Sequence, residues 1–456
     1  MRLKLIFTLS IVLFGQATFS QKKLLDNMYY KKLANGLEVL VVVDNTVPMV
    51  TVEVACRNGS FTETNEYNGL SHLYEHLFFK ANRDYPDYES FNGRMNDLDI
   101  NANATTREEV VNYFFTMPAA NLKPGLSFMN SAIQYPIFKA ADMALENEVV
   151  NAEFTRHESS PVFALIEANA HHMWGDNYSR KNVIGNHDVI LSATPEKMDI
   201  IKNKYYYPNN AIIVVAGDVN PNEAFSYVEN IFGSWKPSTF GPFQKWPIPE
   251  FKPLAKNDYY FVESDKSPVP FMLFSWHGPD TRNDVKATYV ADVFSYIVNQ
   301  NASKLNKALV SSGLAQSASL NYYTQKYTGP ISLMINPNPN KIKECYDEVI
   351  KQISLMATDN YVSDLQIERA KRLLSISQVE NREETAEYAH LLSFWWASAS
   401  VDYYIHYEDN LNKVTRQDIL DYVKKYIKNK HYTAGLMMDK NGFNTVKPQT
   451  FFKSPN

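Results

Sequence analysis

A proline-rich segment divides the 456-residue chain into two parts of similar length. Four prolines fall within residues 241–254, where neither the 3.6-residue period of an amphipathic helix nor the two-residue period of a strand is found. A chain of this length is also too long for one hydrophobic core. We therefore predict a linker at 241–254 between domains at 21–240 and 255–456.

The two parts show the same order of predicted elements. A helix-like segment at 193–206 leads into a strand-like run at 211–216, and a similar segment at 414–426 leads into the run 433–438. This internal repeat indicates that one structural unit occurs twice. We predict an α+β fold of two homologous domains, each an antiparallel sheet packed with helices.

Further strands and helices can be placed from residue type and period. The runs 37–43 and 50–56 are rich in β-branched residues and are separated by a turn at Pro48, so we expect them to pair with each other. A strand-like run at 110–117 and a helix-like segment at 141–157 follow. Beyond the linker, strands are predicted at 271–276 and 331–336 and a helix at 284–299.

Residues 70–80 predict a helix that presents a metal site. His72 and His76 are four residues apart, so on a helix their imidazoles lie one above the other and can bind one cation. Glu75 lies at the edge of that face, where a carboxylate can reach a metal-bound water as a general base without binding the metal. The spacing H-x-x-E-H is the inverse of H-E-x-x-H, and catalytic zinc takes such ligands and leaves one position to water. We predict a Zn²⁺ site; the alternative is a pair of surface histidines.

A third ligand must come from outside this helix, and the acidic segment 145–158 offers several carboxylates. Glu146 and Glu153 are seven residues apart and share a helix face, whereas Glu148 points elsewhere. One of the two could bind the metal while the other orients a ligand. Helical spacing leaves both assignments open, and ordinary solvation of an acidic face is the alternative.

The N-terminus has the pattern of a cleaved secretory signal peptide over residues 1–20. Arg2 and Lys4 precede an apolar run at 5–14, and small residues approach a cut before Gln21. The apolar run is too short to span a bilayer. We expect an exported protein, periplasmic or secreted, that is soluble after cleavage and has no membrane anchor.

The remaining features argue against other classes of protein. Cleavage would lower the formal net charge from −5 to −7, which argues against a nucleic-acid partner. Cys56 and Cys345 are the only cysteines, so the chain is no disulfide scaffold, and each is expected to be a small buried residue. His171 and His172, with Glu167 one turn earlier, could hold a second metal, but we expect a surface or packing role.

These motifs together resemble the pitrilysin/insulinase family of zinc peptidases, the inverzincins. The resemblance is greatest to half-length members such as mitochondrial processing peptidase subunits and their bacterial relatives. It covers nearly the whole mature chain and is carried by His72-x-x-Glu75-His76, Asn103-Ala104-x-Thr106, Glu146-x-x-x-Val150-Asn151-Ala152-Glu153, Tyr206-Tyr207-Pro208-Asn209-Asn210 and Phe232-Gly233-x-Trp235.

The resemblance assigns roles to specific residues. It implies that Glu153 is the third zinc ligand and that Glu146 supports a zinc ligand without binding the metal itself. It also implies that Asn103 and Ala104 lie on an edge strand, to which an extended peptide substrate adds as a further strand.

The sequence departs from the family pattern in two places. A glycine pair that often precedes the Asn-Ala segment is replaced by Leu98 and Asp99. In the second part, Leu309 and Gln316 stand where many active members carry an Arg and a Tyr that assist substrate binding and the transition state. The family architecture and these replacements suggest a heterodimer with a second half-length chain that supplies the two donors; a homodimer is the alternative.

Two functions from different classes are consistent with these observations. The first is a zinc metalloendopeptidase that hydrolyses peptide bonds in extended peptides or unfolded segments, with zinc-activated water and Glu75 as general base. The second is a non-catalytic subunit of the same fold that binds peptides or scaffolds a partner. The complete set His72, Glu75, His76 and Glu153 favours the first, because a chain released from catalysis has no need for all four.

Overall fold

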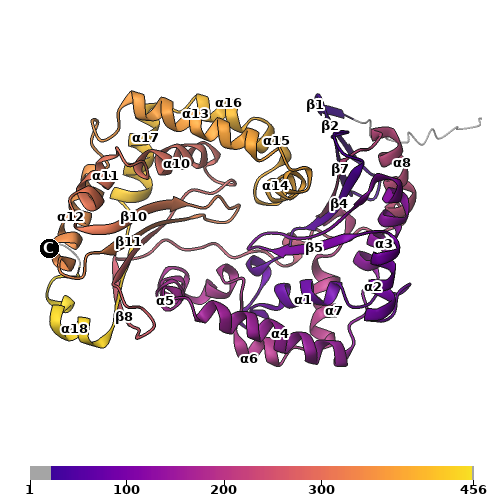
Figure 1. Cartoon of the computed structure of the whole chain (residues 1–456), viewed down its shortest axis with the longest axis horizontal. Coiled ribbons are helices and arrows are strands. Elements are labelled where there is room, and N and C mark those ends of the chain that lie inside the picture. The colour runs from indigo at the N-terminus through magenta and orange to yellow at the C-terminus, as the bar shows by residue number, and fades with distance from the viewer. Residues whose placement is uncertain (1–21, 454–456) are drawn as a thin grey trace, which may run out of the picture.

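The computed structural model describes residues 22–453, which form two mixed sheets packed by helices (Figure 1). The predicted signal peptide lies outside the described residues. The first sheet has the order β1-β2-β3-β7-β4-β6-β5. Its strands are β1 (Lys22–Leu25), β2 (Met28–Lys32), β3 (Glu38–Val43), β4 (Met49–Cys56), β5 (Asn101–Thr106), β6 (Val111–Pro118) and β7 (Ala211–Gly217).

The second sheet repeats this topology with fewer strands, in the order β10-β11-β9-β12-β8. It consists of β8 (Asp258–Glu263), β9 (Phe271–His277), β10 (Ala315–Tyr322), β11 (Pro330–Pro337) and β12 (Thr433–Met438). The order β3-β7-β4-β6-β5 in the first sheet corresponds to β8-β12-β9-β11-β10. The predicted fold class, two similar α+β units, is confirmed.

Each sheet contains one parallel pair that the sequence did not reveal. β3 runs parallel to β7 and β8 runs parallel to β12, whereas the other neighbours are antiparallel. The expected pairing of 37–43 with 50–56 is wrong, because β7 lies between β3 and β4. Val215 of β7 is the register partner of both Val41 and Val52. All seven residues of β7 are buried, as expected for a strand that is paired on both sides.

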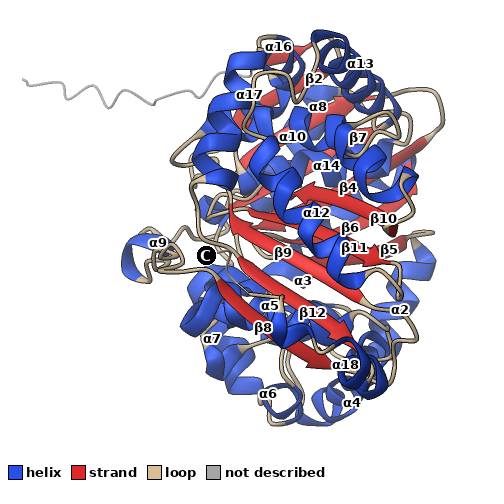
Figure 2. Cartoon of the chain, turned by 90° about the vertical axis from the view of Figure 1, so that its left-hand side faces the viewer, coloured by secondary structure: helices blue, strands red, loops and turns tan. Residues whose placement is uncertain are grey.

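The helices of the first part include both predicted site helices. They are α1 (Leu70–Phe78), α2 (Tyr88–Asp97), α3 (Leu122–Gln134), α4 (Ala140–Glu158), α5 (Phe163–Trp174), α6 (His187–Leu191), α7 (Pro195–Tyr205), α8 (Pro221–Phe232) and α9 (Pro242–Lys245). The short α9, which projects at one edge of the molecule (Figure 2), is the α-helix that the structure places within 241–254. The domain boundaries drawn there stay a prediction.

The helices of the second part follow the linker. They are α10 (Val285–Val298), α11 (Lys304–Asn306), α12 (Ile342–Leu355), α13 (Asp364–Glu380), α14 (Thr385–Ser398), α15 (Val401–Ile405), α16 (Tyr407–Asn412), α17 (Arg416–Val423) and α18 (Lys440–Val446). Both cysteines are buried and unpaired, as expected.

The two parts exchange one helix each. α14 packs on β7 and β4 of the first sheet, and α5 packs on β12 and β9 of the second (Figure 1). Val214 shares a buried cluster with Trp396 of α14, whereas its neighbour Val215 belongs to the cluster on the other face of the sheet. Each sheet is therefore covered on one face by its own helices and on the other by a helix from the opposite part.

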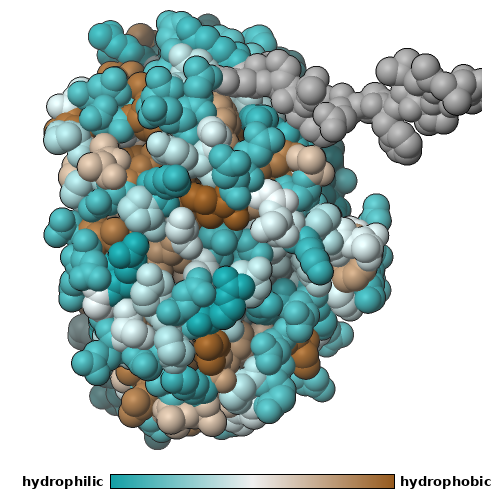
Figure 3. Space-filling model, turned by 90° about the vertical axis from the view of Figure 1, so that its right-hand side faces the viewer, coloured by the Kyte–Doolittle hydropathy of each residue, from teal (hydrophilic) through white to brown (hydrophobic). Residues whose placement is uncertain are grey.

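The outer face of the first part, seen in Figure 3, is mostly hydrophilic. In the face seen in Figure 3, the hydrophobic side chains form small separate patches among polar ones. Within residues 22–453, we find no helix with both the length and the apolar character needed to cross a membrane.

Candidate active site

The start of α1 is fixed by a buried carboxylate. Glu63, 3% exposed, accepts hydrogen bonds from the backbone N–H groups of Gly69 (2.8 Å) and Ser71 (2.7 Å), in the first turn of the helix. These donors have no partner within the helix itself. Burial raises the pKa of Glu63 to about 7, although both backbone hydrogen bonds act in the opposite direction. Ser71 directly precedes His72, so Glu63 helps to set where the histidine face begins.

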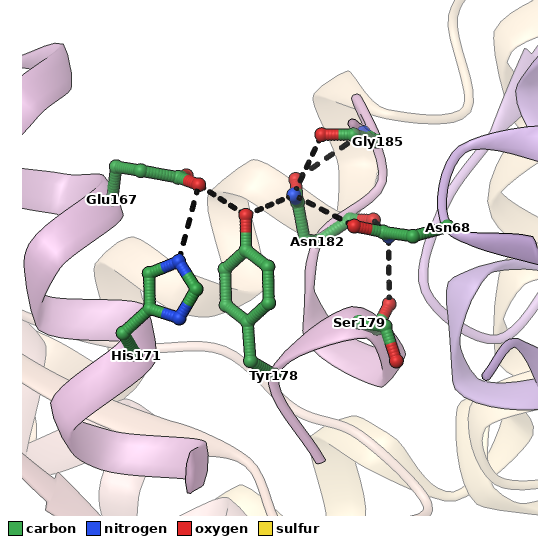
Figure 4. Close-up of polar contacts among 7 residues, drawn as sticks. All are labelled: Asn68, Glu167, His171, Tyr178, Ser179, Asn182 and Gly185. Atoms are coloured by element: carbon green, nitrogen blue, oxygen red, sulfur yellow. Dashed lines mark hydrogen bonds and ion pairs between the residues drawn. The ribbon is translucent and has the colours of Figure 1, made fainter. Parts of the chain in front are cut away.

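A polar network holds the segment before α1 against residues 167–185. Figure 4 shows its members, which are Asn68, Glu167, His171, Tyr178, Ser179, Asn182 and Gly185. The Asn68 amide donates to the carbonyl oxygens of Ser179 (3.2 Å) and Asn182 (3.0 Å). The backbone approaches closely here, because a Cβ placed on Gly69 would lie 2.6 Å from Gly185 Cα. The entry into α1 is therefore held by contacts with chain more than 100 residues away.

His171 and Glu167 take part in this network rather than in a second metal cluster. Their side chains lie 3.7 Å apart, and the His171 ring stacks on Tyr178 with 3.6 Å between centroids. Within residues 22–453, the one group of three or more His, Cys, Asp or Glu with metal-binding geometry lies elsewhere. These contacts are consistent with the surface or packing role that we expected for this pair.

That group consists of His72, His76 and Glu153, whose ligand atoms all lie within 4.8 Å of one another. Glu153 Oε2 is 3.7 Å from His72 Nε2 and 3.6 Å from His76 Nε2. Zinc bonds of about 2.0–2.2 Å in a tetrahedron place ligand atoms roughly 3.3–3.6 Å apart. The separations and the two-imidazole, one-carboxylate donor set therefore fit a zinc ion.

Glu146 lies two turns before Glu153 on α4 and contacts the other side of His76. Its Oε2 is 3.2 Å from His76 Nδ1, and its Oε1 is 2.6 Å from Lys80 Nζ. Burial raises the pKa of Glu146, but the bonds to His76 and Lys80 outweigh this effect and lower it overall. A carboxylate on the outer nitrogen of an imidazole fixes its orientation and leaves the inner nitrogen for a metal.

The two histidines differ in their electrostatic surroundings. Burial and the neighbouring His76 lower the pKa of His72 to about 4, so its imidazole is neutral at neutral pH. Burial also lowers the pKa of His76, but Glu146, Glu75 and Glu153 outweigh this effect and raise it. A raised pKa favours the protonated imidazole of His76, and a cation can bind only the deprotonated form.

Glu75 lies between α1 and β5. Its Oε2 accepts a hydrogen bond from Thr106 Oγ1 at 2.5 Å. Burial raises the pKa of Glu75, although Thr106 and His76 act in the opposite direction. A raised carboxyl pKa lies closer to neutrality, where a general base is most effective.

Asn103 and Ala104 lie on β5, the last strand of the first sheet. They are the register partners of Phe114 and Tyr113 on β6. The opposite edge of β5 has no neighbouring strand within residues 22–453. An extended peptide can therefore pair with β5 as an additional strand.

The departures from the family pattern have distinct structural settings. Asp99, in the turn before β5, has a φ of 51°, a left-handed conformation in which glycine is favoured. Leu309 is fully buried in the core of the second part. Gln316 is exposed on β10, where its side chain contacts Asn336.

Sequence reasoning missed several residues around the site. Lys80 follows His76 by four residues, so the helical period could have placed it near an acidic partner. His187 contacts Asn151 through Nδ1 and lies 3.7 Å from Glu158 through Nε2. Glu63 gave no recognisable signal, because its partners are backbone N–H groups.

We compared the sequence and the fold with those of known proteins. The family description "Insulinase (Peptidase family M16)" matches residues 38–185, and "Peptidase M16 inactive domain" matches residues 192–374. Together these two matches cover most of the chain and define a protein of the metallopeptidase class. The chain belongs to the insulinase family, peptidase family M16.

Among its relatives, Zinc protease PqqE from Helicobacter pylori is 23% identical over 412 residues, covering 88% of this chain and 90% of PqqE. A solved protease structure from Helicobacter pylori has a TM-score of 0.79 at 21% identity, covering 90% of this chain and 98% of that one. The periplasmic protease PqqL from Escherichia coli has a TM-score of 0.73 at 13% identity, covering 96% of this chain but 51% of PqqL. Several other curated zinc proteases match over about half of their own length or less.

Proposed function

We propose that this chain is a zinc metalloendopeptidase that hydrolyses peptide bonds in extended peptides or unfolded segments. The observation that carries the proposal is the convergence of His72, His76 and Glu153, with Glu75 beside them. Two helices far apart in sequence bring these side chains together. Relatives named as zinc proteases give further support.

The residues of the chain divide the chemistry among them. His72, His76 and Glu153 would hold zinc, which when bound activates water and polarises a carbonyl group. Glu146 orients His76 and keeps its inner nitrogen free. β5 aligns the peptide backbone by strand pairing. Glu75 takes a proton from the attacking water and delivers it to the leaving amine.

The zinc and base roles can be tested separately in purified protein. Glu75→Gln should retain zinc and lose turnover, whereas His76→Ala should lose both. The measurements are metal content by elemental analysis and cleavage of an unfolded polypeptide. Retention of most of the kcat by Glu75→Gln would show that another group is the base.

A non-catalytic peptide-binding or scaffolding subunit is the second candidate function. The match of residues 192–374 to a domain described as inactive favours it, as does the absence of Arg and Tyr at Leu309 and Gln316. Under this alternative, purified protein would bind peptides but leave them intact whether or not zinc is present.

We further propose that the active form is exported and contains a second half-length chain. The chain spans 51% of PqqL, a protease described as periplasmic. A partner could supply the Arg and Tyr donors that Leu309 and Gln316 replace, and loss of one such donor costs on the order of a hundredfold in kcat. Activity should therefore rise when half-length partners are added. Full activity of the chain as a monomer or homodimer, with no gain from a partner, would contradict the heterodimer.

A further inference from the structure

A cavity of about 390 Å³ lies on the face of β5 that is turned away from α1. Asn103 and Thr105 line it, whereas Thr106 bonds Glu75 and Ala104 packs in the core cluster that contains α1. Successive residues of a strand point to opposite faces. The zinc helix and the cavity therefore lie on opposite faces of the same edge strand.

The far wall of the cavity comes from the second part of the chain. Leu391 and Phe394 of α14 and Tyr323, just after β10, face Phe114 of β6 across it. The Tyr323 and Phe394 rings are stacked, with 5.9 Å between centroids. The exchanged helix α14 thus completes a pocket whose floor belongs to the zinc-binding part.

The aromatic wall is held in place by a buried polar contact. His390 lies 3.9 Å from the Phe114 ring and bonds through Nδ1 to Glu53, whose side chain is completely buried in β4. Glu53 also accepts a hydrogen bond of 2.8 Å from the Asn112 amide. Both His390 and Phe114 therefore have fixed orientations before any ligand enters.

A peptide paired with β5 would send alternate side chains to the two faces of the sheet. Those on one face meet the side with Glu75 and the histidines, and those on the other meet the cavity. The cavity exceeds the lower limit of about 300 Å³ for small-ligand pockets, which is ample for one large side chain. Its walls offer the faces and edges of three aromatic rings, with which another ring packs favourably.

We infer that this cavity is a specificity pocket for one bulky aromatic side chain of the bound peptide, assembled from β5, β6 and α14. The inference rests on the proposed peptidase function, because it takes β5 as the strand to which the peptide adds. It assigns a role to the second part of the chain, which contributes the wall that selects the side chain. Leu391 is one of the α14 residues that line this wall.

The test measures binding rather than cleavage, so it does not depend on turnover. The full-length Glu75→Gln protein, loaded with zinc, is titrated against fluorescent alanine-based peptides of equal length in which a single Phe is moved through every position. We expect Phe to tighten binding at positions of one parity only. Leu391→Trp, which fills the cavity, should weaken the binding of those Phe peptides by roughly tenfold or more. It should leave the binding of the all-alanine peptide unchanged.

Leu373→Trp is the matched control, because Leu373 is 45% exposed on α13 and lines no part of the cavity. Leu373→Trp should change neither the affinity for the Phe peptides nor the affinity for the all-alanine peptide. Should Leu391→Trp fail to fold, Phe394→Leu removes a ring face and should abolish the preference for Phe. An affinity that is independent of Phe position, or an equal loss for all peptides in Leu391→Trp, would overturn the inference. Parity-dependent binding without cleavage by the wild-type protein, either alone or mixed with half-length partners, would refute the peptidase function and leave the pocket standing.

Discussion

Replacing Glu63 with Gln tests how the first turn of α1 is held. The side chain is buried, and the pKa of its carboxyl group is raised from the ordinary value of 4.5 to about 7. Burial favours the protonated form, whereas the backbone N–H groups of Gly69 and Ser71 favour the charged one. Because these effects oppose each other, the pH dependence of stability shows which is larger.

The sign follows from proton binding. Between about pH 4.5 and pH 7, folded protein keeps a proton on Glu63 that the unfolded chain has released. The stabilisation from Glu63 is therefore fully present below pH 4.5 and is lost as the pH rises through 7. A pKa change of one corresponds to about 1.4 kcal/mol, so the whole effect is on the order of 3 kcal/mol. Gln is neutral at every pH, so the stability of the variant does not fall in this way as the pH rises.

The assay is urea unfolding of zinc-free wild-type and Glu63→Gln proteins at pH 5 and pH 8, followed by tryptophan fluorescence. Other groups titrate in both proteins and cancel in the difference. Relative to the wild type, we expect the free energy of unfolding of Glu63→Gln to increase by up to about 3 kcal/mol as the pH rises. Glu66→Gln, the same change at an exposed neighbouring residue, is measured alongside. If the free energy of unfolding of the variant, relative to the wild type, is instead lower at pH 8 than at pH 5, the two N–H bonds have a larger effect on the Glu63 pKa than burial has.

Two further substitutions test the supports of the site. Glu146→Gln removes the carboxylate from His76 Nδ1 and should weaken zinc binding by roughly 10–100-fold in a chelator competition, with little change in unfolding. Gly185→Ala places a Cβ 2.4 Å from Gly69 Cα at a φ of 92°, so it should cost roughly 2–4 kcal/mol in urea unfolding. Gly93→Ala, where a Cβ would meet nothing within 4 Å, is its control and should be neutral or stabilising.

Local periodicity was enough to locate the two site helices. The helix predicted at 141–157 is α4, Ala140–Glu158, and the one at 70–80 contains α1, Leu70–Phe78. Each helix has a polar face at helical spacing. This pattern can be recognised in the local sequence without knowledge of the rest of the fold. The choice between Glu146 and Glu153 needed more, because only the crossing of α1 and α4 determines which carboxylate faces both histidines. The structure brings both to His76, and their roles stay predictions.

Strand pairing and polar anchoring could not be predicted in the same way. The pairing of β3 with β4 failed because β7, encoded about 160 residues later, lies between them. The side chains of Asn68 and Glu63 gave no motif, since their partners are backbone groups defined only by the fold. Such contacts join residues that no periodic pattern relates.

The helix exchange connects the fold with the proposed chemistry. α14 covers the first sheet as far as β6 and extends to the cavity beside β5, so movement of the second part would change the wall that faces a bound peptide. α5 lies on the second sheet and leads into residues 175–185, which hold the entry to α1. The second part, although it lacks an H-x-x-E-H motif, thus contacts the cavity beside β5 through α14 and contacts α5, which leads into residues 175–185, through its sheet.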